Sequence, residues 1–196
     1  MAMLSPLPLA DAELLFAPTF LSASRASALF EALREQIHWE THRIRLFGRE
    51  VASPRLSCWI GDPGASYVYS NARFEPKSWP WALADLREEI SDAAGERFNS
   101  VLANLYRDGR DGMGWHSDDE PELGGQPVIA SLSLGATRRF VLKHRHDPER
   151  KLAIELPAGS LLVMAGDTQR NYRHALPKTA RPIGARINLT FRRILD

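Results

Sequence analysis

Five short apolar segments follow one another closely in the last third of the chain. They are VIASLSLG (128–135), RRFVLKHR (138–145), KLAIELP (151–157), SLLVMAG (160–166) and ARINLTFRRI (185–194). Each has the length of a single strand and is bounded by Gly, Pro, Asp or Asn. Strands at this spacing, with no helical segments between them, are typical of a sandwich, barrel or jelly roll and not of a parallel sheet with helical crossovers.

Upstream of this stretch, the sequence predicts further strands and two amphipathic helices. The helices are expected at residues 22–37, behind candidate serine caps, and at 81–94, between Pro80 and Gly95. The further strands are expected at 39–46, 56–60, 67–70 and 98–106. The fold class is therefore α+β and mainly β, with both helices packed against a sheet.

The composition is that of an ordinary globular protein. The chain has 196 residues, 44% of them hydrophobic, which is enough to bury a sizeable core. No apolar run approaches the ~18 residues of a membrane helix, and the first residues lack the basic segment of a secretory signal, so the expected location is the cytoplasm. The single cysteine, Cys58, is expected to be a buried, inert thiol. No glycine-rich loop for a nucleotide cofactor is present.

Charge is distributed unevenly along the chain. Residues 1–137 carry a net charge of −7, whereas residues 138–196 carry +8. The basic block indicates an anionic partner. Five basic residues flank the strand pair that follows residue 137 and are expected to contact phosphates: Arg138, Arg139, Lys143, Arg145 and Arg150.

A His-x-Asp pair, His116 and Asp118, lies in the loop-like stretch GMGWHSDDEPELGG. If this stretch is extended, both side chains point the same way and can bind one ion. His174, 56 residues after Asp118, could add a third ligand from a later strand. Two histidines and a carboxylate form the facial triad of non-haem Fe(II) oxygenases, but they also suit a zinc hydrolase. An exposed histidine beside a solvated acidic loop is the simplest alternative, and a binding module without catalysis is another.

Two strands carry polar residues at alternate positions. In RINLTFR, Arg186, Asn188, Thr190 and Arg192 share one face, while Ile187, Leu189 and Phe191 share the other. The two arginines lie about 20 Å apart along the strand, a span that their long side chains can close from opposite ends on a short dicarboxylate. In FNSVLANLY, Asn104 and Tyr106 share a face with Leu102, and both can hydrogen-bond a carboxylate.

Taken in order, the motifs N-x-Y, H-x-D, a distal histidine and R-x-N-x-T-x-R resemble the AlkB family of Fe(II)- and 2-oxoglutarate-dependent dioxygenases. The resemblance is strong over residues 98–196. Weaker similarity upstream is to the branch that acts on duplex DNA. It implies a double-stranded β-helix (jelly roll) as the catalytic core over 98–196. Residues 1–97 would be an N-terminal extension with bracing helices and nucleotide-recognition hairpins as a lid, and the whole would be one compact domain.

The resemblance also implies the chemistry. Iron would be held by His116, Asp118 and His174, and 2-oxoglutarate would chelate it. The implied 2-oxoglutarate pocket consists of Asn104, Tyr106, Arg186, Asn188, Thr190 and Arg192. With O2, the enzyme would hydroxylate N-alkyl groups on DNA bases such as 1-methyladenine or 3-methylcytosine and release an aldehyde. A monomer acting on DNA is expected, with RNA, protein or lipid as alternative substrates.

Base recognition is implied in the same way. Tyr69 and His116 would enclose a flipped base, with Tyr67 and Ser70 nearby. Glu120 would read the base edge, because a carboxylate suits a cationic methylated ring.

A hairpin tip and a tryptophan complete the expected site. Phe47, beside Leu46 and among arginines, would be a wedge that enters the duplex, although a phenylalanine packed on the protein body is the alternative. Trp115 could line the site. The other tryptophans are expected in the core: Trp39, Trp59, Trp79 and Trp81.

Overall fold

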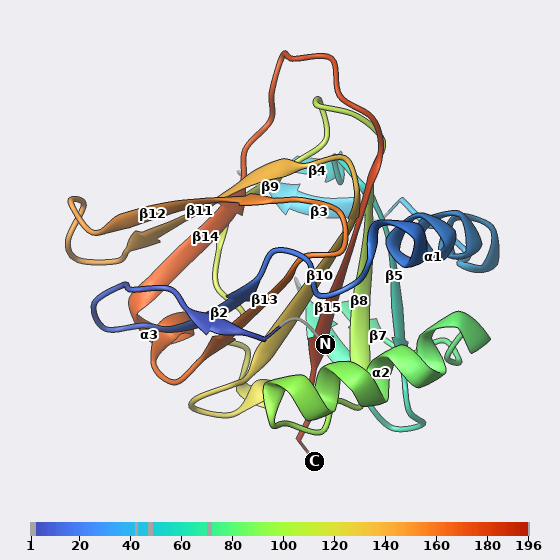
Figure 1. Cartoon of the computed structure of the whole chain (residues 1–196), viewed down its shortest axis with the longest axis horizontal. Coiled ribbons are helices and arrows are strands. Elements are labelled where there is room, and N and C mark those ends of the chain that lie inside the picture. The colour runs from blue at the N-terminus through green and yellow to red at the C-terminus, as the bar shows by residue number, and fades with distance from the viewer. Residues whose placement is uncertain (1–2, 42, 47–48, 70–71, 196) are drawn as a thin grey trace.

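The computed structural model is mainly β, with two long helices on one side (Figure 1). It describes residues 3–41, 43–46, 49–69 and 72–195. The helices are α1 (Ala23–Gln36), α2 (Trp81–Ala94), α3 (Thr168–Asn171) and the 3-10 helix η1 (Pro121–Leu123). The strands are β1 (Ser5–Pro6), β2 (Glu13–Ala17), β3 (Arg43–Leu46), β4 (Arg49–Ala52), β5 (Leu56–Gly61), β6 (Tyr67–Tyr69), β7 (Ala72–Phe74), β8 (Ser100–Tyr106), β9 (Met113–His116), β10 (Ile129–Gly135), β11 (Arg138–His144), β12 (Lys151–Leu156), β13 (Leu161–Ala165), β14 (Tyr172–Leu176) and β15 (Arg186–Arg192).

Two antiparallel sheets form the centre of the molecule. The larger has the strand order β1-β2-β13-β10-β15-β8-β5, and the smaller has the order β12-β11-β14-β9. Apolar side chains from both sheets meet between them, among them Phe140, Leu142, Leu162 and Tyr172. This arrangement confirms the predicted mainly-β class with a jelly-roll core.

The two long helices cover the other face of the larger sheet. Leu33 of α1 and Leu83 and Ile90 of α2 pack in one apolar cluster with the inner residues of β8, β10 and β15. The predicted helices at 22–37 and 81–94 are therefore confirmed as braces. Ser22 caps α1, with its Oγ accepting from Arg25 N at 3.3 Å.

One core prediction is wrong. Trp81, expected in the core, is 78% exposed. It is the first residue of α2 and lies roughly 200° around the helix from Leu83, so its side chain points away from the sheet.

Two short hairpins, β3-β4 and β6-β7, lie outside the sandwich. The strand expected at 39–46 is shorter and begins at Arg43, and the strand expected at 67–70 is described to Tyr69. Phe47 and Ser70 lie outside the described residues. The same is true of the side chains of Tyr67 and Tyr69, so the roles expected of these four stay predictions.

The division at residue 97 also stays a prediction. Strands from before it share the larger sheet with strands from after it: β2 pairs with β13, and β5 pairs with β8. Among the described residues, no helix is long and apolar enough to cross a membrane.

Candidate active site

A pocket lies between the two sheets and contains all nine residues expected to bind iron or 2-oxoglutarate. Its lining is Leu102, Asn104, Tyr106, Met113, His116, Asp118, Ser131, Phe140, Met164, His174, Leu176, Arg186, Asn188, Thr190 and Arg192. The predicted alternation is confirmed, because the polar residues of β8 and β15 face this pocket while the residues between them pack under the helices. The individual roles of the nine stay predictions.

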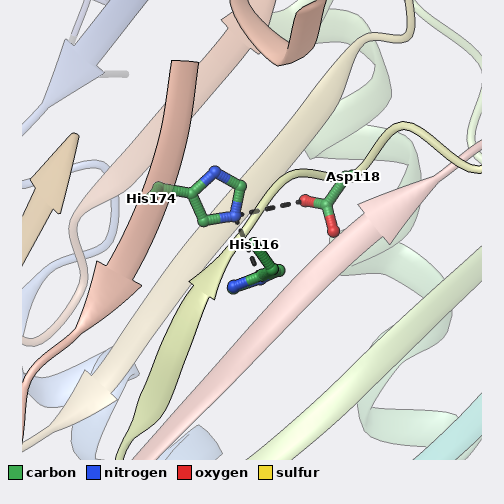
Figure 2. Close-up of side chains that lie close together, drawn as sticks. All are labelled: His116, Asp118 and His174. Atoms are coloured by element: carbon green, nitrogen blue, oxygen red, sulfur yellow. Dashed lines mark hydrogen bonds and ion pairs between the residues drawn. The ribbon is translucent and has the colours of Figure 1, made fainter. Parts of the chain in front are cut away.

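Three possible metal ligands converge at one end of the pocket (Figure 2). His116 ends β9, Asp118 follows in the next loop, and His174 lies on β14 opposite His116. His174 Nε2 is 3.1 Å from His116 Nε2 and 3.7 Å from Asp118 Oδ2. Ligand atoms of all three lie within 4.8 Å of one another. Two ring nitrogens and a carboxylate oxygen so close together need a shared proton or cation between them, and the set matches a facial triad.

The tautomer of His116 suits metal binding. Its Nδ1 lies 2.8 Å from the carbonyl oxygen of Gly114. A carbonyl can only accept, so Nδ1 carries a proton and Nε2 is the ring nitrogen that faces the other two ligands.

The charge states of the other two ligands are set by their surroundings. Burial alone would raise the pKa of Asp118, but the Arg192 guanidinium and the two imidazoles outweigh burial and lower this pKa to about 2. Burial and the neighbouring His116 lower the pKa of His174 to about 3. At neutral pH the set is therefore a carboxylate and a neutral imidazole beside His116, which is the protonation that metal binding requires.

Asp118 is held from several sides. Arg192 Nη2 donates to its Oδ1 at 2.5 Å, and the backbone N–H of Asp118 donates to Gln169 Oε1 at 3.0 Å. Gln169 is buried and belongs to α3. No sequence motif marks Gln169, and only the fold brings it to the Asp118 loop.

Arg145 supports the same loop. Its Nη2 donates to Ser117 Oγ at 2.7 Å and to Asp119 Oδ2 at 2.5 Å. Arg145 was expected to contact phosphate, but in the structure it ties the β11-β12 hairpin to the loop that carries Asp118.

A buried arginine, Arg186, lies further along β15 from the three possible metal ligands. It is 1% exposed, and burial lowers its pKa to about 10, so it remains charged at neutral pH. Its Nη2 donates to Ser133 Oγ at 2.9 Å, and its guanidinium lies 5.4 Å from the Tyr106 ring centroid. Within the described part of the chain, Nε and Nη1 have no hydrogen-bond partner. A buried cation with spare donors fits the carboxylate of a bound acid.

Hydrogen bonds order the polar wall along β15. Asn188 Nδ2 donates to Ser131 Oγ at 2.8 Å, and Thr190 Oγ1 donates to Asn188 Oδ1 at 3.2 Å. The pocket roles of Ser131 and Ser133 were not predicted from the sequence. Their alternation with apolar residues in VIASLSLG does indicate a strand with one polar face.

A second missed residue, Arg55, orders the wall formed by β8. This buried side chain donates from Nε to Asn104 Oδ1 at 2.7 Å and from Nη1 to Ser53 Oγ at 3.0 Å. Ser53 directly follows β4 and Arg55 directly precedes β5, so these bonds connect the segment after the β3-β4 hairpin with the pocket wall.

Two predicted residues lie outside this lining. Glu120 is half-buried just before η1, two residues after Asp118, and is not part of the pocket lining. Trp115 is 47% exposed and lies on the other face of the small sheet, so the expectation that it lines the site is wrong. The reason is strand alternation, because Trp115 precedes His116 in β9 and must point the opposite way.

Three of the five expected phosphate contacts have internal partners. Arg138 is buried and donates to the carbonyl oxygens of Asp111 and Pro177, so that prediction is wrong. Arg150 pairs with Asp11, and Arg145 with Asp119. The remaining two, Arg139 and Lys143, are exposed.

Comparison with known proteins connects this geometry with oxygenases. The family model described as 2OG-Fe(II) oxygenase superfamily matches residues 13–192. The chain is 39% identical over 186 residues to alpha-ketoglutarate-dependent dioxygenase alkB homolog 3 from Bos taurus, covering 90% of this chain and 64% of that protein. It therefore spans less than two thirds of that relative. It is 37% identical over 182 residues to DNA oxidative demethylase ALKBH2 from Homo sapiens, covering 88% of this chain and 70% of that protein.

The fold comparison agrees. The solved structure of OsALKBH1 matches with a TM-score of 0.67 and 16% identity, covering 97% of this chain and 99% of that one. At this identity, the match supports the fold alone.

Proposed function

Because the chain belongs to the AlkB family within the 2OG-Fe(II) oxygenase superfamily, we propose that it is an oxidative demethylase that removes alkyl groups from base nitrogens in DNA. The expected substrates are bases such as 1-methyladenine and 3-methylcytosine. One observation carries the proposal. A His-Asp-His set, of which Asp118 and His174 are buried and His116 is half-buried, lies in the same pocket as a buried arginine with unused donors, which is what a metal and a dicarboxylate need.

Each end of the pocket has a proposed role. His116, Asp118 and His174 bind Fe(II), while Arg186 binds the distal carboxylate of 2-oxoglutarate. When bound, iron, 2-oxoglutarate and O2 supply the oxidation of a C–H bond coupled to decarboxylation to succinate and CO2. The remaining 2-oxoglutarate contacts are assigned to Asn104, Tyr106, Asn188, Thr190 and Arg192.

The protein's own residues prepare this chemistry. Asp118 stays ionised because Arg192 pairs with it, and His174 stays neutral because it is buried, so these two side chains have the charge states that metal binding requires. The buried apolar neighbours Phe140 and Met164 limit water at the pocket.

Base recognition belongs to the same proposal. The target nucleotide would leave the base stack and enter beside His116 and Tyr69, close to Tyr67 and Ser70. Glu120 would meet the cationic ring, and Phe47 would fill the gap in a duplex. A monomer in the cytoplasm acting on DNA is the expected state, and RNA is the alternative substrate.

Mass spectrometry of a 1-methyladenine oligonucleotide tests the proposal. The protein is incubated with the oligonucleotide, Fe(II), O2 and 2-oxoglutarate, and each component is omitted in turn. We expect loss of one methyl mass only when all are present, with succinate formed in equal amount. The same experiment on the corresponding RNA tests the alternative substrate.

Two other outcomes would change the conclusion. If succinate forms while the methyl group persists, the chain is an oxygenase for a different substrate. If the oligonucleotide changes without O2 or 2-oxoglutarate, a zinc hydrolase replaces the oxygenase.

A further inference from the structure

The small sheet has an outer face that the pocket does not use. Side chains alternate along its strands, so Arg173 points outward between the buried Tyr172 and His174 of β14. The exposed residues on the outer face are Trp115, Arg139, Lys143, Lys151, Ala153, Glu155 and Arg173. Most of them line a groove that also includes Lys178 and Arg181 from the segment after β14.

Like charges lie directly opposite each other at one end of this face, whereas at the other end Arg139 lies opposite Glu155. The strand register places Lys143 of β11 opposite Lys151 of β12 on one side and Arg173 of β14 on the other. Among the residues that the structure describes, none of these three forms an ion pair, in contrast to Arg25 with Glu89 on the helical side. Like charges facing each other across strands are destabilising, and a bound polyanion would relieve this repulsion.

An aromatic ring completes the outer face. Trp115 is 47% exposed, although large apolar side chains are usually buried. Lys143 Nζ lies over the Trp115 ring, 5.0 Å from its centroid, so the ring adjoins the row of cations and contacts one of them. Alternating positive charge and exposed aromatic surface is the chemistry by which proteins bind unpaired nucleotides: cations follow the phosphates, and rings stack on the bases.

We propose that the outer face binds the single-stranded DNA that flanks the target nucleotide. Lys143, Lys151 and Arg173 contact its phosphates, and Trp115 stacks on an unpaired base. The inference rests on the proposed function, because the bound strand is the one whose damaged base enters the pocket. The path of the strand from the pocket to the outer face is short, because it crosses only β9, which is an edge strand. Of two consecutive residues of β9, Trp115 belongs to the outer face and His116 to the pocket.

A single strand fits better than a duplex. In a duplex the bases are paired and stacked, so Trp115 would find no free base surface. A strand that leaves the pocket across β9 has unpaired bases near its flipped nucleotide and presents them to the ring.

Binding and turnover of methylated oligonucleotides test the surface. Fluorescence anisotropy would measure the affinity for single-stranded DNA of about 20 nucleotides, longer than a typical single-strand site, and for the corresponding duplex. Turnover would be measured on this strand and on one of about 5 nucleotides. The test variant combines Lys143→Ala, Lys151→Ala and Arg173→Ala. The matched control combines Lys77→Ala, Arg97→Ala and Arg170→Ala, three exposed basic residues elsewhere.

The expected result has three parts. The test variant binds the long strand roughly tenfold more weakly, and the slope of log affinity against log salt becomes about 2 less steep, because three phosphate contacts are lost. Trp115→Ala loses roughly tenfold in affinity for the single strand, whereas Trp115→Phe keeps most of it. Turnover of the short strand is unchanged in every variant.

Three results would contradict the inference. A loss in the test variant no larger than in the control overturns the phosphate contacts. Equal losses of Trp115→Ala on single strand and duplex overturn the stacking. Loss of turnover on the short strand places these residues in the site itself. Failure of the proposed function is seen separately, because the unmodified protein would then demethylate neither strand.

Discussion

Arg186 and Arg192 lie on the same face of β15 and are almost fully buried, at 1% and 3% exposure, yet their partners differ. Arg192 donates to a carboxylate, Asp118 Oδ1, at 2.5 Å. Arg186 donates to a hydroxyl, Ser133 Oγ, at 2.9 Å, and within the described residues it forms no ion pair with a carboxylate. One cation is neutralised inside the protein, and the other requires an anion from outside.

This difference separates stability from binding. A buried ion pair that loses one partner leaves an uncompensated charge, which is strongly destabilising. A buried arginine whose anion arrives with the ligand can be replaced by an apolar side chain of similar length without that cost. The Arg192 end of the pocket should therefore respond to mutation in stability and activity together, and the Arg186 end in binding alone.

The largest effects are expected at the metal ligands. His116→Ala and Asp118→Ala should each lower turnover at least about a thousandfold, because each removes a proposed iron ligand. The two should differ in stability. Asp118→Ala leaves the buried Arg192 unpaired and should lose about 3–5 kcal/mol of unfolding free energy, whereas half-buried His116 should cost far less. Succinate production and urea denaturation measure the two quantities.

A second substitution, at Arg192, provides the control for the stability loss in Asp118→Ala. The double variant Asp118→Ala with Arg192→Met removes both charges and should recover most of the stability lost in Asp118→Ala, with no recovery of turnover. If the single and double variants are equally stable, an unpaired Arg192 costs little unfolding free energy. Full activity in His116→Ala would refute the metal assignment.

Arg186→Met tests the other end of the comparison. We expect the KM for 2-oxoglutarate to rise about 100-fold, because a buried charge-assisted contact is lost. The free energy of unfolding without 2-oxoglutarate should stay the same or rise, because an unpaired buried cation is removed. Steady-state kinetics and thermal unfolding, each with and without 2-oxoglutarate, measure both. A destabilised variant with unchanged KM would mean that Arg186 is a structural residue.

The sequence predicted the pocket well where a local rule applies. Strand alternation placed Arg186 and Asn188 on the pocket face and Ile187 and Leu189 under the helices, and the structure confirms both faces. The order of the motifs indicated the fold, because each motif lies on a different strand that a jelly roll brings to one place.

Where a residue's partner is far away in the sequence, the partner was not predicted. Arg192 was expected to close on a dicarboxylate with Arg186. The structure pairs it with Asp118, 74 residues away, and its contact with 2-oxoglutarate stays a prediction. The sequence predicted a phosphate contact for Arg145, and no motif indicated a role for Gln169. Both residues hold the loop that carries Asp118. Such pairings depend on loop paths that no periodic pattern encodes.

Gln169→Leu is expected to have the smallest effect. It tests how the end of the pocket that holds the Arg192–Asp118 ion pair is organised. Gln169→Leu removes the acceptor for the Asp118 backbone N–H while keeping a similar volume, so the carboxylate should lose orientation but not its partner Arg192. We expect iron to bind roughly tenfold more weakly, as for other residues that orient a metal ligand, with the KM for 2-oxoglutarate unchanged at saturating iron. Arg170→Ala, at the exposed neighbouring position, is the control and should change neither. If Gln169→Leu instead changes the KM for 2-oxoglutarate as much as iron affinity, the two ends of the pocket are coupled and the contrast between Arg186 and Arg192 is not one of independent sites.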